Sequence, residues 1–307
     1  MIFSVIDIGT NTILMATLAV DAGGGITILG DEHEIARLGK GVDATRRILP
    51  ETFDRVAGYL SRYRAVAERL GAERIVAFGT SALRDANNRE DFIRAMRERT
   101  GIEITLLSGS EEAELTYRGA LFKLDMVGSA HAVIDIGGGS TEIAAGVDGR
   151  LKDAISLDIG AVRISERFLS TLPPSADAVR SAREMARRAI GRAFELPADI
   201  DVVGVAGTVT TFGAILTGMR RFDAEELNGL RLPIAEVSRI VAELLAMPVE
   251  RIASIPGVHP DRADLLPGGG IILEEFMRHY DLPAITVSTR GVRYGVALRE
   301  IGSAGRE

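Results

Sequence analysis

Residues 135–142, with the sequence DIGGGSTE, combine residue types that could bind a phosphate group. The segment lies between two apolar runs, a pattern typical of two strands joined by a tight turn. Glycine has no Cβ, so backbone N–H groups in such a turn can approach an anion closely. Asp135 ends the first predicted strand, where its carboxylate could hold a divalent metal ion. The alternative is an ordinary hairpin, because short glycine motifs also occur without a ligand.

A second copy of this pattern lies near the N-terminus. Residues 5–12 read VIDIGTNT, so Asp7 also follows an apolar strand and precedes a turn with glycine, hydroxyl and amide side chains. A repeat of this kind indicates a duplicated architecture. We therefore predict two homologous domains that face each other across a cleft, each contributing one aspartate and one anion-binding turn.

The composition is typical of a globular protein with substantial hydrophobic cores. The chain has 307 residues, of which 46% are hydrophobic and 26% charged, and this length allows two ordinary domains. It has no cysteine and a formal net charge of −7, which excludes thiolate metal sites and argues against a general nucleic-acid binder. We find neither a signal-peptide pattern nor an apolar run of about 18 residues, so we expect a cytoplasmic protein that does not bind a membrane.

The predicted elements have the same order in the two halves. Strands are expected at 2–7, 12–20 and 26–34, and again at 132–136, 141–147 and 151–157. We place the first domain at 1–124 and the second at 125–307, with the closing helix at about 291–301 as a segment that can pack back on the first domain. The predicted fold class is α/β, with a mixed sheet in each domain.

A buried strand predicted at 74–80 leads into the motif TSALRDA. Ligands of open α/β sheets bind beyond the carboxyl ends of the strands. Arg84 is therefore a candidate phosphate ligand, since its planar guanidinium matches phosphate geometry. The alternative is a surface arginine paired with Asp85.

The strand predicted at 102–107 leads into a helix that begins with SGSEEAE. Ser108 and Glu111 have the spacing of a capping box. A glutamate at this end of a strand could also act as a general base, and the spacing alone leaves Glu111, Glu112 and Glu114 open.

Two other features, a strand–helix turn and a glycine cluster, are weaker indications of a site. The turn AGTVTT at 206–211 leads from a buried strand into a helix, which favours an anion or the edge of a nucleotide, although a plain strand–helix turn fits equally well. Residues 268–270 form another glycine cluster before a helix, and the many arginines at 180–192 are interpreted as a solvated or packing face. The four histidines are scattered without metal-ligand spacing.

Taken together, the motifs resemble those of the exopolyphosphatase/guanosine pentaphosphate phosphohydrolase family, within the actin-like, sugar kinase and Hsp70 superfamily. The resemblance covers essentially the whole chain, and it rests on residues 7–12, 80–86, 108–113, 135–142, 206–208 and 262–264. It implies two actin-like (ribonuclease H-like) domains. Ala206 departs from the family, in which glycine is common there, and the chain resembles the short two-domain form rather than longer relatives with a further helical region.

The resemblance also implies a role for individual residues. It points to Glu112 as the base that activates water and to Arg84 as a phosphate ligand, both on the wall of the cleft opposite the turn at 135–142. The implied ligands of magnesium, or of manganese as an alternative, are Asp135, Glu142 and Asp7. The implied substrate-binding residues are Asn11, Thr12, Gly138, Gly139, Ser140, Gly207, Thr208 and Arg262.

The activity implied by the resemblance is hydrolysis of the terminal phosphoanhydride of inorganic polyphosphate. Guanosine pentaphosphate is the alternative substrate, because it presents a terminal phosphate to the same groups. The two Asp-Gly turns would also suit a small-molecule kinase, or an actin-like filament or regulatory ATPase. A kinase would need an adenosine pocket, for which 206–208 and 268–270 are candidates. We expect a homodimer.

Overall fold

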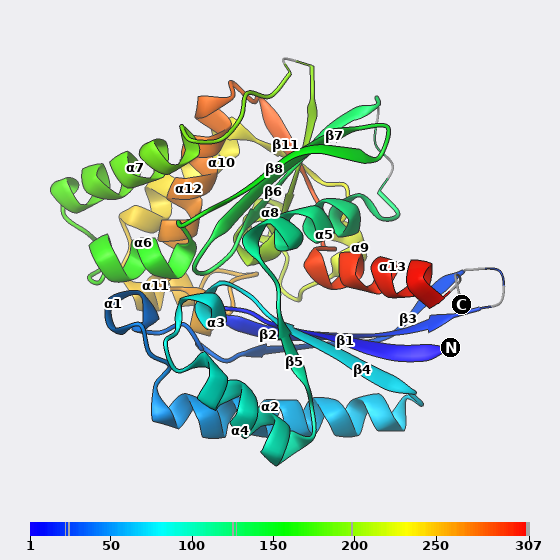
Figure 1. Ribbon diagram of the computed structural model, residues 1–307. Coiled ribbons are helices and arrows are strands. Elements are labelled where there is room, and N and C mark those ends of the chain that lie inside the picture. Colours follow the sequence, from blue (N-terminus) through cyan, green and yellow to red (C-terminus); the bar gives the residue numbers. More distant parts are fainter. Residues whose placement is uncertain (22, 24, 125, 127, 198, 305–307) are drawn as a thin grey trace.

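The computed structural model describes residues 1–21, 23, 25–124, 126, 128–197 and 199–304. Two mixed β-sheets lie one above the other, with helices between them and on their outer faces (Figure 1). The predicted α/β class with a mixed sheet in each half is confirmed. None of the helices in the described part of the chain is long and apolar enough to span a membrane.

Sheet A, in the first half, has five strands in the order β3-β2-β1-β4-β5. Its first three strands form an antiparallel meander, and β4 and β5 extend it in parallel. The strands are β1 (Ile2–Ile8), β2 (Thr12–Val20), β3 (Ile26–Ile35), β4 (Arg74–Gly79) and β5 (Ile104–Leu106).

Sheet B, in the second half, has six strands in the order β10-β11-β9-β6-β7-β8. The strands are β6 (Ala130–Ile136), β7 (Thr141–Val147), β8 (Arg150–Leu157), β9 (Asp201–Val205), β10 (Arg231–Pro233) and β11 (Ala284–Val287). Strand β10 forms an antiparallel edge pair with β11, and the next helix begins directly after it at Ile234. Proline has no N–H to donate and is tolerated at a sheet edge and just before a helix.

The two Asp-Gly turns have the same backbone geometry. Gly9 N donates to Thr12 O at 3.0 Å, and Gly137 N donates to Ser140 O at 3.0 Å. Asp7 pairs in register with Leu14, whereas Asp135 pairs with Glu142. The predicted duplication is therefore present at the level of strand register, with an additional carboxylate in the second copy only.

Helices cover the outer faces of both sheets (Figure 1). On sheet A, α2 (Pro50–Arg69) and α4 (Arg89–Thr100) enclose a core with residues of β1 and β2. On sheet B the core involves α6 (Ala161–Phe168), α7 (Ala176–Ile190), α8 (Ala206–Thr217), α10 (Ile234–Leu245) and α12 (Leu266–His279). The shorter helices are α1 (Val42–Thr45), α3 (Ser81–Asp85), α9 (Ala224–Leu227), α11 (Val249–Ala253) and the 3₁₀ turn η1 (Pro260–Arg262).

Two helices between the sheets each pack on the sheet that the other half of the sequence forms. Helix α5 (Gly109–Leu121) follows sheet A in sequence but packs on β6, β7, β8 and β9 of sheet B, where Tyr117 shares a buried cluster with Val133. Helix α13 (Val292–Ala304) follows sheet B in sequence but packs on β1 and β2, where Val296 shares a cluster with Phe3. Each sheet thus completes its core with a helix from the other half of the sequence.

The predicted domain limits can be compared with this packing. The segment proposed at 291–301 to pack back on the first domain is part of α13, which contacts sheet A. Helix α5 was placed in the first domain but contacts sheet B. Residue 125, the predicted start of the second domain, lies outside the described residues, and the division at 124/125 stays a prediction.

The glycine cluster at 268–270, which we placed before a helix, lies inside α12 instead. An added Cβ at Gly269 would lie 2.2 Å from Thr208 Oγ1, and one at Gly270 would lie 2.6 Å from the Phe212 ring. These glycines therefore allow α12 to pack closely on α8, which outweighs their low helix propensity.

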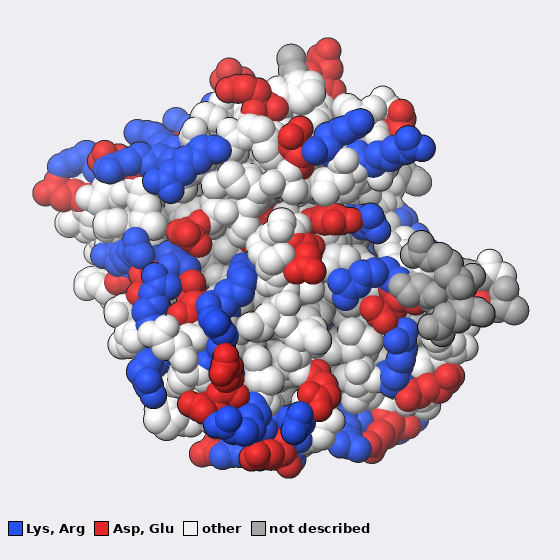
Figure 2. Space-filling view, in the orientation of Figure 1, with Lys and Arg blue, Asp and Glu red and all other residues white. Residues whose placement is uncertain are grey.

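The arginines of α7 form a basic region at the upper left of Figure 2. Two of them pair with buried carboxylates of α12: Arg183 contacts both Glu274 and Glu275, and Arg187 contacts Glu275 at 2.7 Å. The interpretation of this segment as a solvated or packing face is confirmed, since Arg180 and Arg188 pair with neighbours on the same helix.

The crossing of α5 and α13 gives a test of this arrangement. A Cβ at Gly295 would lie 1.8 Å from Leu115 O, and overpacking of this kind commonly costs about 1–3 kcal/mol. We expect Gly295→Ala to lower the free energy of unfolding by at least about 3 kcal/mol in urea denaturation, because the clash is with backbone. Gly58 is an exposed position of α2, where an added Cβ meets nothing within 4 Å. Gly58→Ala should therefore leave the free energy of unfolding equal to that of the wild type or slightly higher. Equal stability of the two variants would contradict the crossing.

Candidate active site

Four carboxyl groups are buried where the two sheets meet at their glycine turns. Asp7 comes from β1, Asp135 from β6, Glu142 from β7 and Glu112 from the first turn of α5. Their relative exposures lie between 2% and 8%. The structure thus brings together the residues that the sequence suggested as metal ligands and base.

Burial raises the pKa of three of these carboxyl groups, and the Glu112 carboxylate adds to each increase. Burial raises the pKa of Asp135 to about 7, and the Glu112 carboxylate adds to the increase. Burial also raises the pKa of Asp7 and of Glu142 well above the usual range, again with a contribution from Glu112. Like charges in a poorly solvated region disfavour ionisation, so this region favours a bound cation.

Arg84 is the cation closest to these groups. Its Nη1 donates to Glu112 Oε2 at 2.5 Å and to Leu107 O at 3.0 Å, and its Nη2 lies 4.0 Å from Glu142 Oε1. Burial still raises the pKa of Glu112, although Arg84 opposes the increase. The alternative pairing of Arg84 with Asp85 is not found; Asp85 binds Arg46 and Arg163 instead.

The three glutamates of α5 have different environments. Glu111 completes the capping box, since Ser108 N donates to Glu111 Oε2 at 2.8 Å and Glu111 N donates to Ser108 Oγ at 3.2 Å. Glu114 is partly exposed and pairs with Arg118 on the same helix. Of the three, Glu112 alone is buried and faces Arg84.

Glu112 does not lie on the wall that we expected. Because α5 packs on sheet B, Glu112 belongs with Asp135 and Glu142, while Arg84 and Asp7 come from the first half. The expectation that Arg84 and Glu112 share one wall is wrong, because it assumed that a helix covers the sheet that precedes it in sequence. The Arg84–Glu112 ion pair therefore crosses the cleft.

In the second turn, the peptide carbonyls all face the N-terminus of α6. Ala161 N donates to Gly137 O at 2.9 Å, Val162 N donates to Gly138 O at 2.9 Å, and Arg163 Nε donates to Gly139 O at 2.9 Å. In a trans peptide the N–H points opposite to the C=O. The N–H groups of residues 138–140 accordingly face the other way, and none of them donates to another described residue.

The first turn is held in the same manner by backbone groups of the loop after β3. Thr10 O accepts from Gly39 N at 2.7 Å, and Asn11 O accepts from Arg37 N at 2.8 Å. The Asn11 N–H then has no acceptor among the described residues, and its buried Oδ1 has no donor. Successive free N–H groups form a nest that binds anions.

The two turns approach each other closely. A Cβ at Gly138 would lie 2.9 Å from Thr10 Cβ, and one at Gly139 would lie 2.5 Å from Ser81 Oγ. Only glycine fits at both positions, and the two walls of the cleft are in contact there.

The other three predicted substrate residues lie beside the first turn. Arg262 Nη2 donates to Thr12 Oγ1 at 3.0 Å and lies 2.8 Å from His33 Nε2. A Cβ at Gly207 would lie 1.6 Å from Arg262 Nη1, and Thr208 follows in α8. Burial lowers the pKa of Arg262 to about 10, and among the described residues no carboxylate pairs with its guanidinium. This guanidinium is therefore available to an anion.

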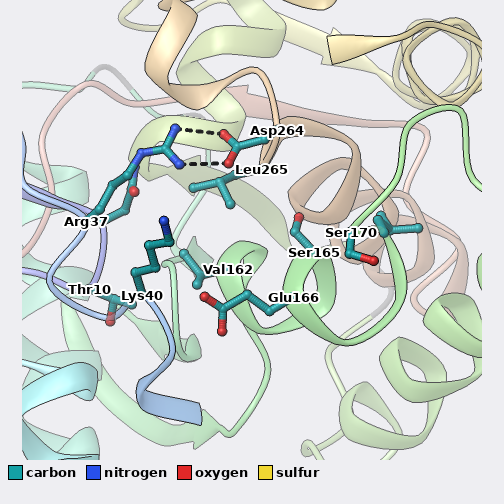
Figure 3. A pocket seen from close by; sticks show the side chains of 11 residues that line it. Thr10, Arg37, Lys40, Val162, Ser165, Glu166, Ser170, Asp264 and Leu265 are labelled. Carbon is teal, nitrogen blue, oxygen red and sulfur yellow. Dashed lines mark hydrogen bonds and ion pairs between the residues drawn. The ribbon is translucent and has the colours of Figure 1, made fainter. Parts of the chain in front are cut away.

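A cavity of about 180 Å³ opens next to these groups, between the two halves. Thr10, Arg37 and Lys40 line it from the first half, and α6 and Asp264 from the second. Figure 3 shows Lys40 extending between Arg37 and Val162, with Arg37 bound to both carboxylate oxygens of Asp264 at 2.9 and 3.1 Å. Cations and turn residues thus line the same opening.

The buried acids fit a magnesium ion that is bound together with substrate. No group of three or more His, Asp or Glu side chains within the described ranges has the arrangement of a complete metal cage. Magnesium commonly uses only one or two carboxylates, with phosphate oxygens and water as its other ligands. The cross-strand neighbours Asp135 and Glu142 provide such a pair of carboxylates, and the unpartnered Oδ1 of Asp7 belongs to the same buried group.

Comparison with known proteins now identifies the family. Residues 17–304 match the sequence model of the Ppx/GppA phosphatase family. The chain belongs to this family. The predicted family is therefore confirmed, and with it the identification of the chain as a hydrolase of the phosphatase type.

Relatives of known name and structure cover nearly all of this family member. It is 36% identical over 312 residues to exopolyphosphatase 2 of Mycobacterium tuberculosis, covering 97% of this chain and 98% of the relative. It superposes on an exopolyphosphatase of Cytophaga hutchinsonii with a TM-score of 0.88 and 25% identity, covering 99% and 98% of the chains. A Ppx/GppA member of Aquifex aeolicus gives a TM-score of 0.83 at 25% identity, with coverage of 99% and 98%. The actin-like two-domain fold is thereby confirmed.

The sequence analysis did not identify four residues that contact or lie near the groups of this site. Ser156 Oγ donates to Glu142 Oε1 at 2.7 Å, and Arg293 lies close enough to Asp7 to oppose the rise in its pKa. His33 binds Arg262, and Arg163 binds the second turn. Each comes from a segment distant in sequence from the group it contacts, so no local motif could have found it.

The raised pKa of Asp135 predicts a stability effect with a definite sign. The folded protein keeps a proton on Asp135 up to a pH of about 7, whereas the unfolded chain releases it near pH 4. This contribution is complete below the unfolded value and is lost as the pH rises towards 7.

Without metal, the free energy of unfolding should therefore fall between about pH 4 and 7, and less steeply in Asp135→Asn. Urea denaturation at several pH values measures both slopes. The exposed Asp153→Asn serves as the control and should follow the wild type. Parallel slopes for wild type and Asp135→Asn would contradict the raised pKa.

Proposed function

We propose that this protein is an exopolyphosphatase, which releases phosphate from the end of inorganic polyphosphate. The observation that carries the proposal is the pair of opposed turns with free N–H groups beside the ion pair of buried Glu112 with Arg84. Membership of a phosphatase family and the nearly complete coverage of an exopolyphosphatase support the substrate class.

In this proposal the terminal phosphate binds the N–H groups of Asn11 and residues 138–140. Thr12, Ser140 and Arg262 add hydroxyl and guanidinium donors, with Gly207 and Thr208 behind Arg262. Anions gain most from donors that are already oriented before binding. Further phosphates of the chain would extend into the cavity beside Lys40.

Magnesium, with manganese as an alternative, would be held by Asp135, Glu142 and Asp7 together with substrate oxygens. The ion would neutralise phosphate charge and relieve the repulsion among the buried carboxylates. Arg84 would bind the phosphate from the opposite wall and stabilise charge that develops in the transition state.

Glu112 would take the proton of the attacking water. Burial raises its pKa, which makes the carboxylate a better base towards water near neutral pH. Its 2.5 Å bond to Arg84 holds both groups in place without substrate. When phosphate binds Arg84, the Glu112 carboxylate becomes free to accept a proton.

A kinase is less well supported than a hydrolase. The turn into α8, which was a candidate for an adenosine pocket, is covered by Arg262, and α12 packs on Thr208 through Gly269. The second candidate, residues 268–270, lies inside that helix contact. Guanosine pentaphosphate stays an alternative substrate with the same chemistry.

Two properties beyond the reaction are also proposed from the resemblance and the composition. We expect a cytoplasmic homodimer that binds neither nucleic acid nor a membrane. Light scattering of the purified protein tests the dimer, and fractionation of cells tests the location.

The role of Glu112 predicts a specific kinetic effect. We expect Glu112→Gln to lower kcat by about 10²–10⁴-fold, because a general base contributes on this scale. Tripolyphosphate should still bind, as isothermal titration calorimetry would show. Glu114→Gln, at a partly exposed position on the same helix, is the control and should keep normal kcat. Normal activity of Glu112→Gln would assign the base to another residue.

A substrate panel tests the function itself. Purified protein with magnesium is incubated with short polyphosphate, long polyphosphate, guanosine pentaphosphate or ATP, and phosphate release is measured. We expect release from polyphosphate without any acceptor, loss of activity with a chelator, and its return with magnesium. Phosphate transfer from ATP to an acceptor, with no release from polyphosphate, would instead indicate a kinase.

A further inference from the structure

We propose that Arg163 is the positioning residue of the second phosphate-binding turn. It fixes the Gly139–Ser140 peptide with its N–H towards substrate and aligns this turn with the helix that carries Arg84. The inference rests on the proposed function, in which the turn binds the terminal phosphate.

The contacts of Arg163 connect both walls of the site. From α6, its Nε donates to Gly139 O at 2.9 Å, while Nη1 donates to Asp43 and Nη2 to Asp85, each at 2.6 Å. The residue is 5% exposed, although its guanidinium lies between the two halves of the chain. One guanidinium thus binds a turn of sheet B and two carboxylates of the first half.

The contact with Gly139 determines which way a peptide faces. A glycine peptide can rotate easily, since no Cβ restricts its dihedral angles. Rotation of the Gly139–Ser140 peptide would direct a carbonyl oxygen, instead of an N–H, at the bound phosphate. The Arg163 guanidinium disfavours this rotation because it offers the carbonyl a charged donor on the other side.

In the first turn, a different donor holds the equivalent peptide. There the carbonyl of Asn11, equivalent to Gly139, accepts from a backbone group, Arg37 N. Both copies therefore fix the same peptide, one through a backbone N–H and the other through the Arg163 side chain. Every substitution except proline leaves a backbone N–H in place, whereas the guanidinium of Arg163 is removed by a simple side-chain substitution.

The contact with Asp85 places α3 relative to the turn. Asp85 is adjacent to Arg84, and α3 also carries Ser81, which lies against Gly139. A displaced α3 would move Arg84 away from Glu112. Loss of Arg163 should therefore weaken phosphate binding and lower kcat, rather than only reduce stability.

Helix α6 offers a matched control. Arg167 binds both oxygens of Asp43, at 2.6 and 2.8 Å, and contacts no residue of the turn. Arg163→Met and Arg167→Met each remove a guanidinium bound to Asp43, but only Arg163→Met releases Gly139. Asp43→Asn weakens the connection between the halves and leaves the Gly139 contact in place.

The experiment measures kcat and KM for phosphate release from tripolyphosphate with magnesium, the affinity for inorganic phosphate, and the unfolding midpoint. We expect Arg163→Met to lower kcat/KM about 100-fold, the scale of one lost anion-stabilising donor, and to weaken phosphate binding. Arg167→Met and Asp43→Asn should stay within about threefold of wild type, as expected for a partly exposed ion pair. A folded Arg163→Met with the activity of Arg167→Met, or an equal loss in Asp43→Asn, would overturn the proposal.

Arg163→Met leaves Asp85 with one partner fewer, so the single variant can be unstable. Arg163→Met/Asp85→Asn removes this carboxylate and should recover the unfolding midpoint without recovering activity. Recovery of both would mean that Arg163 is only structural. Failure of the proposed function is distinguishable, because wild-type protein would then release no phosphate from tripolyphosphate.

Discussion

The burial of four carboxyl groups at one point is the constraint on which the rest of this structure depends. Taking Asp7, Glu112, Asp135 and Glu142 out of water disfavours their charged forms. Arg84 compensates only part of this charge, and it comes from the opposite wall. A cation bound with the substrate would neutralise the remaining negative charge. This requires that the two walls of the cleft keep their relative positions. The contacts of α6 and of the loop after β3 are consistent with this requirement.

The two turns show how a duplication can keep a geometry while its supports change. In both, the N–H of the first glycine donates to the backbone carbonyl three residues later at 3.0 Å. In the first copy, Leu14 stands where Glu142 stands in the second. The first copy is held by loop backbone and the second by the N-terminus of α6 and one arginine. Anion binding is thus shared by the copies, whereas carboxylates gather mainly around the second.

Local patterns predicted the parts of the fold and site that depend on neighbouring residues. The strands, the Asp-Gly turns and the capping box at Ser108 follow from alternation, glycine and side-chain spacing, and all were correct. Contacts between distant segments were not predictable in this way. Glu112 was assigned to the wrong wall, the glycines at 268–270 were placed before their helix, and Arg163 gave no signal, because each depends on which helix packs where.

Because α13 packs on the sheet of the other half of the sequence, the fold has a consequence for folding during synthesis. Helix α13, the last described element, covers the face of sheet A that carries Phe3, Val5 and Leu18. The N-terminal half emerges from the ribosome long before α13 does, so this apolar face lacks that helix while the second half is translated. The nascent chain therefore passes through a state with exposed hydrophobic surface, the kind of species that chaperones bind during synthesis.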